Sequence, residues 1–246
     1  MTLQVCVNGA RNIPDHPELS TDELFSAAEC AKAVEAGVSS IHLHPKNAEG
    51  KDSLVPSDVA RWIIAFRNAC PGVPLGMTTG AWAVSSHAER MALVAAWDPL
   101  PDFASVNWHE EGAEELAGFL LDRGIGVEAG LWAVDNARTW AQSRLASRCL
   151  RALVELPDTL PEEVPVLAEE ILSVVSAAHP TLSVLLHGEE RSAWSALSLA
   201  TERGLDTRVG LEDTLFRPDG SVVSSNAELV RIHLERVRDH LTRSSE

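Results

Sequence analysis

Short apolar runs alternate with longer amphipathic segments along this chain of 246 residues. A short apolar run bounded by turn residues is typical of a buried strand, and apolar positions three or four residues apart are typical of a helix. The pattern predicts eight strand-then-helix pairs without linkers. The predicted strands are 3–8, 37–44, 74–79, 102–107, 126–131, 151–156, 182–187 and 207–211. The predicted helices are 21–35, 56–69, 86–97, 113–123, one from about 134, 161–178, 192–203 and 226–241.

The alternation of strands and helices implies a parallel sheet. Eight pairs in about 250 residues match the size of a (β/α)8 TIM barrel, so we expect an α/β fold with residues 1–246 in a single barrel domain. A doubly wound sheet is the competing architecture. Neither common type of phosphate-binding glycine loop is present in the sequence.

Helix ends are marked by capping residues. Ser20 with Glu23 three residues later forms the pattern of a capping box for the first helix, and Ser225 or Asn226 is placed to cap the last one. Residues 242–246 are polar and are expected to form a short frayed tail.

Composition narrows the classes of partner. The chain has 20 basic and 36 acidic residues and a formal net charge of −16, which argues against nucleic acid or an anionic membrane as a partner. No apolar run is long enough to span a bilayer and there is no basic-then-apolar leader, so the expected location is the cytoplasm. The cysteines show no close pairing and are expected to be buried thiols: Cys6, Cys30, Cys70 and Cys149.

Two histidines, His42 and His44, stand at the carboxyl end of the second predicted strand, just before Pro45. Side chains two residues apart on a strand point to the same face. Such a pair suits Zn²⁺ or a similar divalent ion, which needs at least one more protein ligand. Glu212 ends the last strand, which is one strand removed from the histidines in a closed barrel, and could reach the same metal. A pair of hydrogen-bonded strand histidines is the alternative interpretation.

Other polar residues also gather at strand ends, where the active site of a (β/α)8 barrel lies. Several of them could instead do no more than satisfy backbone groups at the end of a strand. The strand-end residues outside the histidine pair are Asn8, Thr78, Thr79, Ser105, Asn107, His187, Glu212 and Asp213.

Glu128 lies within the fifth predicted strand, and a buried carboxylate needs a partner. His187 and His109 are expected to be solvated loop histidines.

Arg208 and Asp213 belong to the same final segment and could form a catalytic pair. An arginine beside a carboxylate keeps it ionised, and an ionised aspartate near a polarised carbonyl is a plausible general base. A metal would polarise a keto oxygen and stabilise the oxyanion that forms. The alternative for Arg208 is an ordinary salt bridge at the lower end of the barrel.

These residues, in this order, resemble the β-keto acid cleavage enzymes, the family of 3-keto-5-aminohexanoate cleavage enzyme. The resemblance spans nearly the whole chain, and the histidine pair together with the Glu-Asp strand end is its most specific part. The matching segments are Asn8-Gly9-Ala10, 36–44 with the histidine pair, Thr78-Thr79-Gly80, Ala104-Ser105-Val106-Asn107, 208–213 and 225–230.

The resemblance implies a (β/α)8 barrel that holds one Zn²⁺ through His42, His44 and Glu212. It implies that a β-keto acid reacts with acetyl-CoA to give acetoacetate and a new CoA ester. It also implies a homo-oligomer, either a dimer or a tetramer.

The same resemblance assigns roles to single residues. Asp213 matches the family's general base, and Arg208 matches the arginine that supports it. Thr78 and Ser105 match substrate contacts, and Glu128 resembles a family glutamate of the fifth strand. We count Asn8, Arg11 and Asn107 among the substrate-binding candidates.

The chain departs from the family in a few places. Arg11 stands where the best-known member has a glutamate for the amine of its substrate, so we expect an acidic or neutral substrate tail. Lys46 replaces the usual arginine after the histidine pair, and residues 156–161 replace a glycine-rich turn. The nearest candidate patch for the phosphates of CoA is Arg138, Arg144, Arg148 and Arg151, which solvated helix arginines would explain equally well.

Two other functions compete with cleavage of β-keto acids. A metal-dependent hydrolase also uses a strand-end histidine pair, but such barrels place further histidines on the fifth and sixth strands, where this chain has Glu128 and Glu155. A barrel that binds a metal and a small ligand without catalysis is the third possibility.

Overall fold

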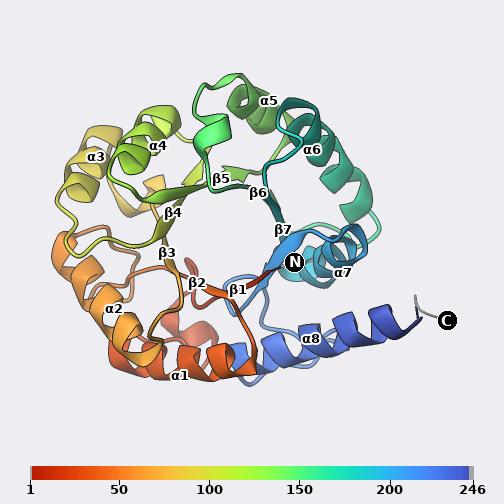
Figure 1. Cartoon of the computed structure of the whole chain (residues 1–246). Helices are drawn as coiled ribbons and strands as arrows, with labels where there is room; N and C mark the ends of the chain where they lie inside the picture. The colour runs from red at the N-terminus through yellow and green to blue at the C-terminus, as the bar shows by residue number, and fades with distance from the viewer. Residues whose placement is uncertain (1, 244–246) are drawn as a thin grey trace.

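The computed structural model describes residues 2–243 and shows a closed barrel of eight parallel strands in sequence order. Pairing of β8 with β1 closes the barrel, and the helices form a ring around it (Figure 1). The (β/α)8 prediction is therefore confirmed over the doubly wound sheet. The strands are β1 (Leu3–Cys6), β2 (Ser40–Leu43), β3 (Leu75–Thr78), β4 (Phe103–Asn107), β5 (Gly126–Leu131), β6 (Arg151–Leu156), β7 (Val184–Gly188) and β8 (Asp206–Val209).

Each strand is followed by a helix that packs on the outside of the barrel. Within residues 2–243, none of these helices is both long and apolar enough to cross a membrane. They are α1 (Glu23–Ala36), α2 (Pro56–Ala69), α3 (His87–Ala95), α4 (Ala113–Asp122), α5 (Val134–Gln142), α6 (Val164–Ala178), α7 (Ala193–Arg203) and α8 (Asn226–Arg243). Short 3-10 turns are η1 (Ile13–Asp15), η2 (Ala81–Ala83), η3 (Ala146–Arg148) and η4 (Glu190–Ser192).

The cap predicted for the first helix is wrong. Asp22, rather than Ser20, is the N-cap of α1, and its carboxylate accepts hydrogen bonds from the backbone nitrogens of Leu24 and Phe25. Ser20 instead accepts a hydrogen bond from the backbone nitrogen of Asp22, in the turn that leads into the helix. Aspartate and serine cap equally well in general, so the sequence alone did not separate the two.

The last strand ends earlier than predicted. β8 stops at Val209, and residues 210–214 form a tight turn that carries Glu212 and Asp213. Glycine is required at Gly210, since a Cβ atom there would lie 1.9 Å from the carbonyl oxygen of Cys6. Close approach of the two backbones lets the turn fold over the end of β1.

The start of α6 and the end of α8 differ from prediction. α6 begins at Val164, after a turn over residues 161–163. α8 continues to Arg243, so the first residues of the predicted tail are helical, and residues 244–246 lie outside the described part of the chain.

Apolar side chains fill the layer between the strands and the helices, whereas buried polar residues such as Gln4, Glu128 and Arg151 lie inside the barrel. All four cysteines are buried free thiols, as expected. Two fully buried tryptophans also hold the loop after β2: the indole nitrogen of Trp62 donates to the carbonyl of Lys46, and that of Trp97 donates to the carbonyl of Leu54. The loop from Lys46 to Leu54 is thereby fixed beside the carboxyl end of β2.

Candidate active site

A cavity of about 450 Å³ opens at the carboxyl ends of the strands. Most of the predicted site residues meet there, although they come from strands and loops far apart in sequence. Those that line the cavity are Arg11, His42, His44, Thr78, Ser105, Asn107, Arg208 and Glu212. Among the described residues, Asn8, Glu128 and Asp213 lie behind this lining.

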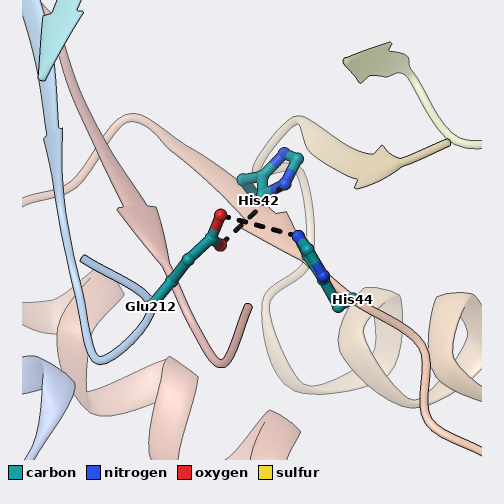
Figure 2. A group of neighbouring side chains, drawn as sticks. All are labelled: His42, His44 and Glu212. Carbon is teal, nitrogen blue, oxygen red and sulfur yellow. Dashed lines mark ion pairs between the residues drawn. The ribbon is translucent and has the colours of Figure 1, made fainter. Parts of the chain in front are cut away.

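Three side chains in the cavity could hold a metal ion. One ligand atom from each of His42, His44 and Glu212 lies within 4.8 Å of the others. Figure 2 shows the glutamate facing both imidazoles. The Glu212 carboxylate oxygens lie 4.0 Å from Nε2 of His42 and 3.5 Å from Nε2 of His44. Two imidazoles and one carboxylate form a donor set that suits Zn²⁺ and leaves positions open for substrate.

Two observations fit a metal at this point. Oε2 of Glu212 is buried without a hydrogen-bond partner in the described part of the chain, which is costly for an ionised carboxylate unless a cation faces it. Burial lowers the pKa of His42 to about 4, against the opposing charge of Glu212. The imidazole of His42 is therefore neutral near pH 7, as a metal ligand must be.

His44 is oriented by a network of its own. Nδ1 of His44 lies 2.8 Å from a carboxylate oxygen of Asp52, so it donates there and leaves Nε2 free to face Glu212. Trp82 stacks on the His44 ring and donates to the same Asp52 oxygen. The buried ammonium of Lys46 donates to the other Asp52 oxygen. Outer carboxylates of this kind fix the tautomer and direction of a metal-binding histidine.

The charges around His44 shift two pKa values. Burial lowers the pKa of His44, but the carboxylates of Asp52 and Glu212 outweigh it and raise that pKa to about 9. Burial acts in the opposite sense on Asp52, yet the charges of His44 and Lys46 hold its pKa well below the ordinary range. Without a metal, His44 and Asp52 thus form an ion pair in which the carboxylate stays ionised.

Glu212 is positioned by the turn after β8. Gly9 has a positive φ of 54°, and a Cβ atom there would lie 2.3 Å from Cγ of Glu212, so only glycine leaves room for the glutamate. The amide of Asn226 accepts from the nitrogen of Leu211 and donates to the carbonyl of Val7, which ties the turn to β1. These contacts bring Glu212 to the histidines of β2.

Arg208 holds the two acidic residues of the turn together. Its Nη2 donates to Glu212 at 2.9 Å and to Asp213 at 3.1 Å, and its side chain is buried. Burial raises the pKa of both carboxyl groups, but the charge of Arg208 outweighs it and lowers both below their usual values. Both carboxylates are therefore ionised at neutral pH.

Asp213 lies beneath the cavity with both oxygens in contact with protein groups. Cys6 donates to one oxygen at 2.8 Å, and Arg208 donates to the other. Burial, and next the charge of Asp213, raise the pKa of the Cys6 thiol well above its usual value, so the thiol stays protonated. Nδ1 of His187 lies 3.3 Å from Asp213.

The expectation for His187 is wrong. It is not a solvated loop histidine but a member of β7 with no exposed surface. Its ring lies between Asp213 and Glu155. The pattern that identified His42, a histidine at the end of a buried strand, applied to His187 as well and could have placed it in the site. His109, in contrast, is exposed as expected.

Glu128 lies below His42, inside the barrel. One of its oxygens accepts from Gln4 and Arg151, and the other lies 3.9 Å from Nδ1 of His42. A buried Glu128 was expected to need a partner. That partner is Arg151, a buried residue at the amino end of β6, away from the cavity. The geometry places Glu128 where it can orient His42.

The predicted substrate contacts occupy different positions. The amide of Asn8 accepts from the backbone nitrogen of His44 and donates to its carbonyl, so it holds the chain at the end of β2. Thr78 and Ser105 face the cavity, and Asn107 is fixed there by a hydrogen bond to Glu110. Arg11 reaches across the cavity mouth to Glu190, 2.6 Å away.

Several residues in or beside the cavity were not predicted. Asp52 lies in the loop after β2 and Trp82 in the short turn η2 after β3, where the sequence pattern does not determine side-chain direction. Glu155 and Glu189 form part of the wall near β6 and β7. Burial, followed by the charge of Glu155, raises the pKa of Glu189 to about 7.

The predicted patch of arginines is wrong. Arg151 points into the barrel toward Glu128, while Arg138 and Arg148 are exposed and pair with nearby aspartates. Arg148 and Arg151 also flank the amino end of β6, on the opposite side of the barrel from the cavity. These residues do not form a common surface beside the active site.

The role of Asp52 can be tested by metal binding. We expect Asp52→Asn to weaken the affinity for Zn²⁺ by roughly 10- to 100-fold, because the neutral amide no longer fixes His44 by a charge-assisted hydrogen bond. Competition with a chromophoric chelator measures this, and Asp135→Asn on the exposed face of α5 is the matched control. Equal affinities for the wild type and Asp52→Asn would contradict this role.

Comparisons with solved structures show a shared fold. ObcA in complex with oxaloacetate matches with a TM-score of 0.72 and 17% identity over 93% of this chain, and the chain spans only 64% of the length of ObcA. A ternary complex of ObcA with a C4-CoA adduct and oxalate gives a TM-score of 0.74 at 16% identity, over 91% of this chain and 64% of ObcA. A type I 3-dehydroquinate dehydratase from Clostridium difficile matches with a TM-score of 0.66 at 10% identity, over 97% of this chain and 92% of that one.

Sequence comparisons identify the family. The curated 3-keto-5-aminohexanoate cleavage enzyme of Fusobacterium nucleatum subsp. nucleatum is 22% identical over 244 residues, which cover 94% of this chain and 88% of that protein. The family model described as beta-keto acid cleavage enzyme matches residues 1–243. Because that match covers nearly the whole sequence, this chain belongs to the β-keto acid cleavage enzyme family.

Proposed function

We propose that this protein is a Zn²⁺-dependent enzyme that condenses a β-keto acid with acetyl-CoA and releases acetoacetate and a new CoA ester. The observation that carries the proposal is the group of His42, His44 and Glu212 on the floor of the cavity, in a chain of this family. One metal per chain is proposed. Bound there, the ion would supply Lewis acidity toward the keto oxygen of the substrate.

The Arg208–Asp213 pair is proposed to promote removal of a proton from the carbon between the two carbonyl groups of the substrate. Arg208 keeps the Asp213 carboxylate ionised, which a base requires at neutral pH. The guanidinium also borders the cavity and supplies a positive charge to a bound keto acid. Asp213 is only 1% exposed, so its charge acts through the groups packed around it.

Neutral polar side chains are proposed to orient the substrate. Thr78 and Ser105 present hydroxyl groups on the β3 and β4 side of the cavity, and Asn107 presents its amide nearby. Glu128 is proposed to act from beneath, by holding the ring of His42, and Asn8 by holding the backbone of His44. These two residues stay in the proposed site as positioning groups.

Acetyl-CoA is proposed as the co-substrate. Support comes from membership of the family and from ObcA, which has been solved with a C4-CoA adduct. The cytoplasmic location and the homo-oligomeric state stay predictions.

The competing functions find less support. A hydrolase with further metal ligands on β5 and β6 would use Glu128 and Glu155, but Glu128 is bound by Gln4 and Arg151, and Glu155 faces His187. Glu212 and Asp213 are ionised carboxylates beside the buried Arg208, and burying such charges is costly. A barrel that only binds a ligand gains nothing from this cost. Turnover of any β-keto acid separates the proposed function from a binding role.

Turnover can be measured directly. We expect the Zn²⁺-loaded protein to form acetoacetate and one new CoA ester in equal amounts from acetyl-CoA and at least one β-keto acid of a chemically varied panel. Asp213→Asn should lower kcat by roughly 100-fold or more, because the Arg208–Asp213 pair loses the negative charge that promotes proton removal. Asp122→Asn on the surface should leave kcat unchanged. Absence of any CoA ester from the metal-loaded wild type would contradict the proposed function.

In our proposal, Arg11 determines which substrate tail the enzyme prefers. Its guanidinium lines the cavity and is paired with Glu190, so an acidic or neutral tail would meet it without repulsion. Arg11→Glu should remove the preference for acidic β-keto acids, measured as a ratio of kcat/KM values between acidic and neutral substrates. Arg138→Glu, on the exposed face of α5, is the control of equal charge change. An unchanged ratio in Arg11→Glu would contradict this role.

A further inference from the structure

A salt bridge at the mouth of the cavity involves a carboxylate to which the proposed function assigns no role. Nη2 of Arg11 lies 2.6 Å from Oε1 of Glu190. The two residues belong to different segments, Arg11 to the loop after β1 and Glu190 to the turn η4 after β7. Both line the cavity. The pair therefore borders the space that a bound substrate would occupy.

Arg11 is anchored beside the candidate metal centre. Its Nε donates to the carbonyl of Leu211 at 2.5 Å, in the turn that carries Glu212. The ammonium of Lys46 donates to the backbone carbonyl of Arg11 at 3.4 Å. Only 17% of the Arg11 side chain is exposed. Its guanidinium is thus a fixed cation on the cavity wall.

Glu190 has an unusual backbone conformation. Its φ is +50°, and within residues 2–243 it is the one residue other than glycine with a positive φ. This left-handed region is costly for a residue with a side chain, because Cβ crowds the backbone. The backbone nitrogen of Glu190 donates to the carbonyl of Asp213 at 2.7 Å, which holds the conformation. Strained residues of this kind gather at functional sites, and here the strained residue is the one whose carboxylate meets Arg11.

The two arginines among the described lining residues differ in their partners. Arg208 is buried and bound by Glu212 and Asp213, and both of these carboxylates have proposed roles. Arg11 is bound by Glu190, whose side chain is 35% exposed. A partly exposed salt bridge contributes little to stability, so another carboxylate can replace Glu190 at small cost. Arg11 is therefore the arginine that a substrate can engage.

Acidic neighbours make the partner of Arg11 decisive for a negatively charged ligand. Glu155 on β6 and Glu189 after β7 line the cavity together with Glu190. Like charges brought together oppose binding. A carboxylate that enters this part of the cavity is therefore held only if it gains the guanidinium of Arg11 in place of Glu190.

We propose that Glu190 is a specificity-determining residue, whose carboxylate occupies on Arg11 the place that a substrate carboxylate takes. The substrate class is a β-keto acid with a second carboxylate at the end of its tail. Such a substrate exchanges one ion pair for another, whereas a neutral tail leaves the Arg11–Glu190 pair intact. Glu190 thereby makes the preference for acidic tails weaker than Arg11 alone would give. The inference rests on the proposed function, because that function supplies the β-keto acid.

Two substitutions at one position separate the carboxylate of Glu190 from its backbone. Glu190→Gln removes the charge and keeps the strained backbone, and Glu190→Gly removes the charge and relieves the strain. Both should raise the ratio of kcat/KM for acidic over neutral β-keto acids by roughly three- to fivefold, the effect of releasing one partly exposed ion pair. Glu170→Gln, exposed on α6, should leave the ratio unchanged. A rise in Glu190→Gly alone, or in neither variant, would overturn the role of the carboxylate.

A variant without Arg11 separates ion-pair exchange from a general effect of charge. In an Arg11→Gln background, Glu190→Gln should raise the ratio less than it does in the wild type, since the carboxylate then has no cation to release. An equal rise in both backgrounds would show that Glu190 acts only by repelling the tail, and would overturn the exchange.

Binding of unreactive acids separates the inference from the proposed function. Calorimetric titration of the Zn²⁺-loaded protein compares the dicarboxylates succinate, glutarate and adipate with the monocarboxylates butyrate, valerate and hexanoate. Glu190→Gln should lower Kd for at least one dicarboxylate by the same factor as the ratio above, with Kd for its monocarboxylate unchanged. Unchanged Kd values for all three dicarboxylates would overturn the role of Glu190 and leave the proposed function intact. Absence of turnover of any β-keto acid by the wild type would overturn the proposed function and the substrate class with it, while the titration would still test the exchange at Arg11.

Discussion

The buried guanidinium of Arg208 is the group on which the charges of this site depend. Taking carboxylates out of water is costly unless a cation pairs with them. Arg208 supplies that cation to both Glu212 and Asp213, in a turn that folds back from the end of β8. The candidate metal ligand and the candidate proton-handling group are therefore kept ionised by the same side chain. Without it, neither carboxylate would carry the charge that its proposed role needs.

Most of the fold could be predicted from the sequence because the apolar pattern changes its period at each strand and helix. α2 and the strands β5 and β6 have the predicted bounds. The errors fall where local chemistry offers two solutions, as with Ser20 and Asp22 before α1. They also fall where one backbone meets another, as at Gly210, because contacts between distant segments leave no periodic signal in the sequence.

The same distinction applies to the candidate site. A barrel brings strand ends together, so His42, His44 and Glu212 could be predicted as one group from their positions alone. Asp52 could not, since its contact with His44 depends on the path of a loop held by buried tryptophans. The burial of His187 could have been predicted, since it ends a strand as His42 does, but its contacts with Glu155 and Asp213 leave no signal in the spacing of the sequence.

The most direct test of the central claim is the metal content of the purified protein, wild type against His44→Ala, after dialysis with Zn²⁺ and removal of the excess. We expect about one Zn²⁺ per chain in the wild type, little in His44→Ala, and the wild-type amount in His109→Ala, which removes an exposed histidine. Retention of one Zn²⁺ by a folded His44→Ala protein, or no Zn²⁺ in the wild type, would contradict the metal centre and the function built on it.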